Sequence, residues 1–127
     1  MQTVRLYEKE IYEGCMDVSI ECYIHKSSPE LTATPRPAMI VFPGGGYTFT
    51  SDREAEPIAS AYFSEGYNCF VVRYITGVRA QKNKPLFDAA AAIAYVRRYS
   101  SQYNIDSEKI AVIGFSAGGH LAGYIAT

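Results

Sequence analysis

The distribution of hydrophobic and polar positions along the chain predicts five short strands. Residues 18–24 alternate between apolar and other side chains, and this period of two indicates a half-buried strand. Residues 38–42 are apolar without interruption, as in a strand covered on both faces. Residues 4–7, 68–74 and 109–113 are also rich in apolar residues and are bounded by polar or glycine-containing segments, which predicts three further strands.

Two segments between these strands have helical periodicity. Residues 54–65 place an apolar stripe on one face, and Gly66 provides a stop signal. Residues 85–99 repeat alanine and branched apolar residues at helical spacing. Pro85 suits the first turn of this helix because the missing N–H has no partner at that position.

The alternation of strands and helices predicts an α/β fold with a mostly parallel sheet and helices on both faces. The first two strands have no helix between them, so we expect them to form an antiparallel edge. Residues 27–37 contain three prolines, and residues 75–84 are polar; both segments are predicted loops. The length of 127 residues fits one domain, residues 1–127.

Composition excludes several classes of function. The chain is 48% hydrophobic, as in a globular protein with a core. Its formal net charge is -1, so it lacks the excess of basic residues that would indicate binding to nucleic acid or to a membrane surface. The N-terminus lacks the apolar segment of a signal peptide. The three cysteines are scattered without C-x-x-C spacing, which predicts reduced, buried thiols and a cytoplasmic protein. No cluster of Cys, His and Asp residues has metal-ligand spacing, so we expect no metal site.

The segment from Ile110 to His120 holds the most informative motif. An apolar strand runs into Gly114-Phe-Ser-Ala-Gly118 and then into a stretch of small residues. This Gly-x-Ser-x-Gly spacing between a strand and a helix is that of a nucleophile elbow, in which a strained turn exposes the serine hydroxyl. A tight turn with an ordinary exposed Ser116 is the alternative interpretation.

A glycine loop upstream favours the elbow. Gly44, Gly45 and Gly46 follow the predicted strand 38–42, and their backbone can approach a substrate closely. Together with the N–H of Ala117, the loop could provide donors to the oxyanion of an acyl-transfer reaction. A phosphate-binding loop is a weaker alternative, because no Lys-Ser/Thr pair follows these glycines.

These motifs resemble the α/β-hydrolase fold. The resemblance rests on Pro43-Gly-Gly-Gly-Tyr47, on residues 65–74, on Pro85 with Asp88, and on Gly114-Phe-Ser-Ala-Gly-Gly-His-Leu-Ala122. Within that fold they are most similar to bacterial carbohydrate esterases of the acetyl-xylan-esterase-like group. The similarity runs from about Leu6 to the last residue and covers the first half of the fold.

The resemblance implies a serine esterase for small acyl esters, often acetyl groups on sugars, that needs no cofactor. It implies Ser116 as the nucleophile and the N–H groups of Gly45 or Gly46 and Ala117 as the oxyanion hole. The Asp and His that complete the catalytic triad in such enzymes would come after Thr127. We therefore expect a chain shortened at its C-terminus, completed by self-association or by a further C-terminal segment. A non-catalytic module that binds a ligand or partner is the alternative.

Other polar residues near these motifs have structural interpretations. His120 lies one helical turn after Ser116, where it could act as a base but is better explained as packing or hydrogen-bonding support. His25 lies far upstream and is a weak candidate. Tyr47 could line an acyl pocket. By resemblance Asp88 anchors a loop and helix, and Asp52 and Glu54 are explained by a helix start.

Overall fold

The computed structural model describes residues 1–28, 30, 34–80 and 83–126, and contains one five-stranded sheet with the order β1-β2-β4-β3-β5. The strands are β1 (Gln2–Arg5), β2 (Ser19–Tyr23), β3 (Arg36–Phe42), β4 (Asn68–Arg73) and β5 (Ile105–Gly114). The helices are α1 (Glu56–Ser64), α2 (Lys84–Arg98) and α3 (Ala117–Ala126), with short 3₁₀ turns η1 (Cys15–Asp17), η2 (Asp52–Glu54) and η3 (Gly77–Arg79).

The sheet is mixed. β1 pairs with β2 and β2 with β4 in antiparallel fashion, whereas β3 lies parallel to both β4 and β5. The predicted antiparallel pair at one edge is therefore confirmed. At the other edge, β5 pairs with no described strand other than β3.

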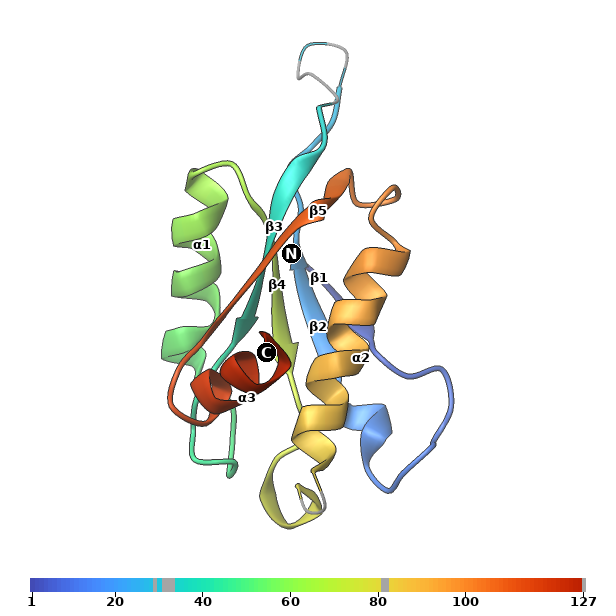
Figure 1. Cartoon of the computed structure of the whole chain (residues 1–127), viewed down its shortest axis with the longest axis vertical. Helices are drawn as coiled ribbons and strands as arrows, with labels where there is room; N and C mark the ends of the chain where they lie inside the picture. Colours follow the sequence, from blue (N-terminus) through green and yellow to red (C-terminus); the bar gives the residue numbers. More distant parts are fainter. Residues whose placement is uncertain (29, 31–33, 81–82, 127) are drawn as a thin grey trace.

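Helices cover both faces of the sheet, as the sequence pattern predicts. In Figure 1, α1 and α2 stand on opposite sides of the strands. Ala55 and Ala59 pack against one face, near Val41 and Val71. On the other face, α2 and α3 enclose a second apolar cluster that includes Ile40, Phe70, Ala92 and Leu121. β3 and β5 pair in parallel up to Phe42 and Gly114, so the C-terminal ends of these strands, where both sequence motifs occur, lie side by side.

Several predicted boundaries were wrong, for identifiable reasons. β1 ends at Arg5 rather than at Tyr7, because the Tyr7 side chain leaves the edge to bind Asp88. β3 begins at Arg36, inside the predicted loop, because the Arg36 N–H donates to the carbonyl of Asn104. A register irregularity follows between Arg36 and Ala38, and such irregularities accommodate proline at position 37. The predicted-loop residues 29, 31–33, 81 and 82 lie outside the described residues.

Asp88 on α2 anchors the N-terminal segment and the end of β4. Its fully buried carboxyl accepts hydrogen bonds from the hydroxyls of Tyr7 (2.6 Å) and Tyr12 and from the N–H of Ile75 (2.8 Å). Burial raises the pKa of Asp88, while the three donors and Lys84 act in the opposite direction. The structural role expected for Asp88 thus has specific partners, which satisfy an otherwise unfavourable buried carboxyl.

Replacing Tyr12 by phenylalanine is expected to lower the free energy of unfolding by about 1.5–3 kcal/mol, the range for a hydrogen bond to a charged group. Chemical denaturation followed by circular dichroism measures the change. Tyr67→Phe is the matched control, because the Tyr67 hydroxyl bonds no described residue. Equal stability of the two variants would contradict the anchoring role of Tyr12.

The effect of Tyr12→Phe should also depend on pH. Because the pKa of Asp88 is raised in the folded protein, its contribution to stability is largest in acid and declines as the pH rises through that pKa. Loss of the Tyr12 donor raises this pKa further. The destabilisation should therefore be small below the ordinary carboxyl pKa of about 3.9 and should grow as Asp88 ionises.

Candidate active site

Ser116 lies on the turn that joins β5 to α3. β5 ends at Gly114 and α3 begins at Ala117. Ser116 is exposed and has φ 54°, a left-handed conformation that is uncommon outside glycine. Backbone strain of this kind is concentrated at functional sites. The predicted strand-to-helix turn with a strained serine is therefore present.

Close packing against β3 explains the glycine after the serine. A Cβ atom at Gly118 would lie 1.9 Å from the carbonyl oxygen of Phe42, which leaves no room for any side chain. The Phe115 N–H donates to that same carbonyl over 3.1 Å. These contacts hold the start of α3 directly against the C-terminal end of β3.

The glycine loop lies beside Ser116. A Cβ atom at Gly44 would lie 2.5 Å from the carbonyl oxygen of Phe115 and 3.0 Å from Cβ of Ser116. The Gly44 N–H donates to Oε1 of Glu54 over 2.9 Å, so it is already engaged. Glu54 thus fixes the loop, a role that its position at a helix start did not reveal.

Three other backbone donors in this region have no internal acceptor. Within the described part of the chain, the N–H groups of Gly45, Gly46 and Ala117 donate to no protein atom. Gly45 and Gly46 have φ values of 141° and 64°, which favour glycine at both positions. Unpaired N–H groups near an exposed hydroxyl are available to an anionic ligand.

Tyr47 connects the glycine loop to its surroundings. Its backbone has φ 65°, and its carbonyl accepts the N–H of Gly77 over 2.6 Å. Its hydroxyl lies 3.3 Å from the carbonyl oxygen of Ala117 and 3.1 Å from Nδ1 of His120. Desolvation by burial raises the pKa of the Tyr47 hydroxyl, which favours its protonated, hydrogen-bonding form.

Neither histidine contacts the serine hydroxyl among the described residues. The imidazole of His120 is hydrogen-bonded to Tyr47, in agreement with a supporting role. His25 stacks on Phe63 with a centroid distance of 3.7 Å, and its Nε2 lies 3.0 Å from the Phe63 carbonyl oxygen. The described residues thus place the serine beside backbone donors but place no base beside it.

The remaining candidate chemistry is limited. Within residues 1–28, 30, 34–80 and 83–126, no group of acidic, histidine and cysteine side chains has a metal-binding arrangement. Cys15, Cys22 and Cys69 are buried and unpaired with one another, and burial raises the pKa of Cys22 to about 11 and of Cys69 to about 12. None of the described helices has the length and apolar character required to span a bilayer.

Comparison with known proteins places the chain in a family. The family model BD-FAE matches residues 24–127, and the chain belongs to this family. An endo-1,4-beta-xylanase B from Butyrivibrio fibrisolvens is 38% identical over 94 residues, which represent 72% of this chain and 15% of the xylanase. Other relatives are named probable carboxylic ester hydrolase, esterase and acetylxylan esterase, and the chain spans 19–30% of their lengths.

Solved structures establish the α/β-hydrolase fold. MGS-M1, an α/β-hydrolase enzyme from a Medee basin deep-sea metagenome library, superposes with a TM-score of 0.89 at 46% identity, over 99% of this chain and 50% of MGS-M1. An acetyl ester-xyloside bifunctional hydrolase from Caldicellulosiruptor lactoaceticus gives a TM-score of 0.88 at 36% identity, over 99% of this chain and 46% of that enzyme. The chain therefore spans about half the length of these enzymes.

Proposed function

We propose that Ser116 is the nucleophile of a serine esterase acting on small acyl esters, with acetyl esters of sugars as the favoured class. The observation that carries the proposal is the left-handed, exposed Ser116 between β5 and α3, beside backbone donors that have no acceptor among the residues that the structure describes. The names of relatives as acetylxylan esterase and acetyl ester-xyloside hydrolase support the substrate class.

The proposed reaction has two stages. The Ser116 Oγ attacks the ester carbonyl carbon, and the N–H groups of Gly45, Gly46 and Ala117 donate to the resulting oxyanion. Collapse of the tetrahedral intermediate breaks the ester C–O bond, releases the alcohol and leaves an acyl group on Ser116. Water then attacks the acyl carbon, releases the acid and restores the serine hydroxyl.

A base must accept the Ser116 proton and return it to the departing alcohol. We propose that this base, and the carboxylate that orients it, come from outside the 127 residues. The proposal follows from the side chains around Ser116, since His120 is bonded to Tyr47 and His25 to the Phe63 carbonyl. The same observation supports the alternative, a non-catalytic module that binds an acyl ester or a partner without turnover.

The 127-residue chain alone is expected to hydrolyse 4-nitrophenyl acetate only weakly. An oxyanion hole without a complete triad still accelerates acyl transfer by roughly 10³–10⁴-fold over water. Ser116→Ala should abolish acetylation of the chain, which mass spectrometry measures, whereas weak release of 4-nitrophenol by direct attack of water at the oxyanion hole can survive the substitution. Ser64→Ala is the matched control, because Ser64 is exposed on α1 and its hydroxyl, within the described part of the chain, bonds only the Ala61 carbonyl of the same helix.

Each outcome distinguishes the candidates. Acetylation of the chain that survives Ser116→Ala unchanged would exclude Ser116 as the nucleophile. No Ser116-dependent turnover and no acylation would favour the non-catalytic module. Full esterase activity of the chain alone would show that a base is available within it or within a second copy.

We also propose that these residues act as a single domain whose open β5 edge pairs with a further strand. Ile110, Val112 and Ile113 are only partly buried and Ala111 is exposed, whereas the central residues of β3 are buried. An apolar edge strand presents unpaired N–H and C=O groups to other chains. The partner strand would come from another segment of the protein or from a second copy of the chain.

A further inference from the structure

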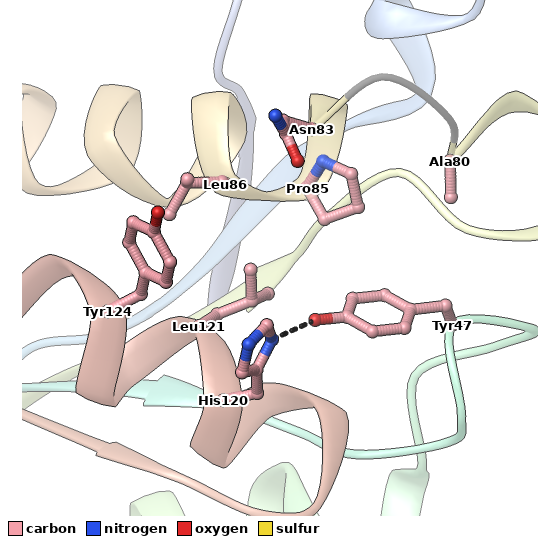
Figure 2. A pocket seen from close by; sticks show the side chains of 8 residues that line it. All are labelled: Tyr47, Ala80, Asn83, Pro85, Leu86, His120, Leu121 and Tyr124. Carbon is pink, nitrogen blue, oxygen red and sulfur yellow. Dashed lines mark hydrogen bonds between the residues drawn. The ribbon is translucent and has the colours of Figure 1, made fainter.

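A small cavity lies between the glycine loop and the helices α2 and α3. Its volume is about 230 Å³, and it is lined by Tyr47, Pro85, Leu86, His120, Leu121 and Tyr124, among others. Figure 2 shows the aromatic and aliphatic side chains around it. An apolar cavity of about 150 Å³ holds benzene, so this cavity has room for one six-membered ring with substituents.

Its wall is joined to the site around Ser116. His120 lies on the first turn of α3, and its N–H donates to the Ser116 carbonyl over 3.0 Å. Tyr47 belongs to the segment that follows Gly45 and Gly46. The Tyr47 and His120 side chains that line the cavity therefore belong to the same two segments as the proposed oxyanion donors.

The hydrogen bonds of Tyr47 determine which nitrogen of His120 carries the proton. The Tyr47 hydroxyl has one hydrogen, and a carbonyl oxygen can only accept. Satisfying the 3.3 Å contact to the Ala117 carbonyl therefore requires Tyr47 to donate there. The 3.1 Å contact to His120 then requires Nδ1–H of His120 to donate to the Tyr47 oxygen.

This arrangement leaves Nε2 of neutral His120 as a hydrogen-bond acceptor. In Figure 2 the second ring nitrogen lies on the side of the imidazole away from Tyr47, toward Tyr124. Among the described residues no donor is bonded to this nitrogen. The lining also includes the Asn83 amide and the Tyr124 hydroxyl, and its remaining side chains are mainly apolar or aromatic, so it combines ring-binding surfaces with polar groups that include the His120 acceptor.

We propose that the cavity binds one six-membered ring bearing a hydroxyl group, and that this hydroxyl donates to Nε2 of His120. The assignment of the ring to the ester substrate rests on the proposed function, whereas binding and the tautomer do not. Tyr47 acts as a positioning residue, because it sets the tautomer without contacting the hydroxyl. A saturated sugar ring and a phenol share this chemistry and are the two sources to distinguish.

The tautomer can be measured directly by ¹⁵N NMR of the two histidines at the high-pH plateau of their titrations. The chain contains only His25 and His120, and His25→Gln assigns the signals. His120 should show a protonated Nδ1 and an unprotonated Nε2. His25 is an internal control with the opposite expectation, because its Nε2 must donate to the Phe63 carbonyl. The Nε2–H tautomer at His120 would overturn the proposal.

Binding is tested by titrating the chain with phenol and with methyl pyranoside, following the signals of His120 and Leu121. Anisole and a fully O-methylated pyranoside are the matched ligands without a hydroxyl donor. We expect each hydroxyl ligand that binds to lose about 2- to 10-fold in affinity when methylated, the range for one hydrogen bond. The tighter of the two hydroxyl ligands identifies the source.

Tyr47→Phe should convert His120 toward the Nε2–H tautomer and abolish the preference for the hydroxyl ligand. Tyr62→Phe, a remote variant on α1, should leave both unchanged. Equal affinity for hydroxyl and methylated ligands, or no perturbation at the cavity, would overturn the proposal. Neither readout involves turnover, so loss of Ser116 chemistry and failure of this site are separate results.

Discussion

An alanine at position 118 is expected to prevent the chain from reaching its native fold. The added Cβ would lie 1.9 Å from the carbonyl oxygen of Phe42 and 2.6 Å from the carbonyl oxygen of Pro43. Both atoms belong to the backbone, so no side-chain rotation relieves the overlap, and α3 would have to move off the end of β3. We expect a loss of more than about 4 kcal/mol, a large share of the 5–15 kcal/mol that stabilises a typical domain.

Gly123→Ala is the matched control in the same helix. A Cβ atom at Gly123 meets no atom within 4 Å, and alanine is favoured over glycine in a helix by about 1 kcal/mol. This variant should therefore be as stable as the parent or more stable. Thermal unfolding followed by far-ultraviolet circular dichroism compares the two. A Gly118→Ala protein that unfolds within about 1 kcal/mol of the parent would contradict the described packing.

Self-association of the chain through the β5 edge is the second large effect that we expect. The 127-residue chain on its own should form dimers or larger species at micromolar concentration, because the apolar β5 edge is open to pairing. Ala111→Lys introduces a charge at an exposed position of this strand and should shift the chain toward monomer by at least about tenfold in dissociation constant. Lysine at a strand edge is a common protection against pairing.

Ala61→Lys is the control for added charge, since Ala61 is exposed on α1 and does not belong to β5. Sedimentation velocity over a concentration series measures all three proteins. A parent chain that remains monomeric throughout the series would exclude pairing between copies through β5. If Ala111→Lys and Ala61→Lys weakened self-association equally, the effect would be due to net charge and not to the β5 edge.

Local patterns predicted most of the fold because most elements have their own signals. The alternation in β2 places Ile20 and Cys22 in the core, as expected. By contrast, the start of β5 carries Asp106, Ser107 and Glu108, which have no strand signal. Their backbone is extended because Ile105 pairs with Arg36, which is far away in the sequence. Their polar side chains are tolerated because this part of the edge strand is largely open to solvent.

The candidate active site likewise has features that the sequence predicts and features that depend on the tertiary fold. The turn at Ser116 and the neighbouring glycine loop were predictable, because each requires particular residues at fixed spacing. The hydrogen bonds of Tyr47 and Glu54 were not predictable, because no local sequence pattern indicates which distant residue each side chain will contact. Tyr47 reaches His120 across 73 positions, and its role depends on the tertiary fold alone.

The hydrogen bonds of Asp88 also bear on where this folding unit begins. The matched family region starts at residue 24, but Tyr7 and Tyr12 donate to the carboxyl of Asp88. β2 in addition supplies the antiparallel neighbour of β4. A protein trimmed to the region that the family model matches would leave the Asp88 carboxyl with fewer donors and would turn the central strand β4 into an edge strand. The folding unit therefore extends on the N-terminal side of the region that the family model matches.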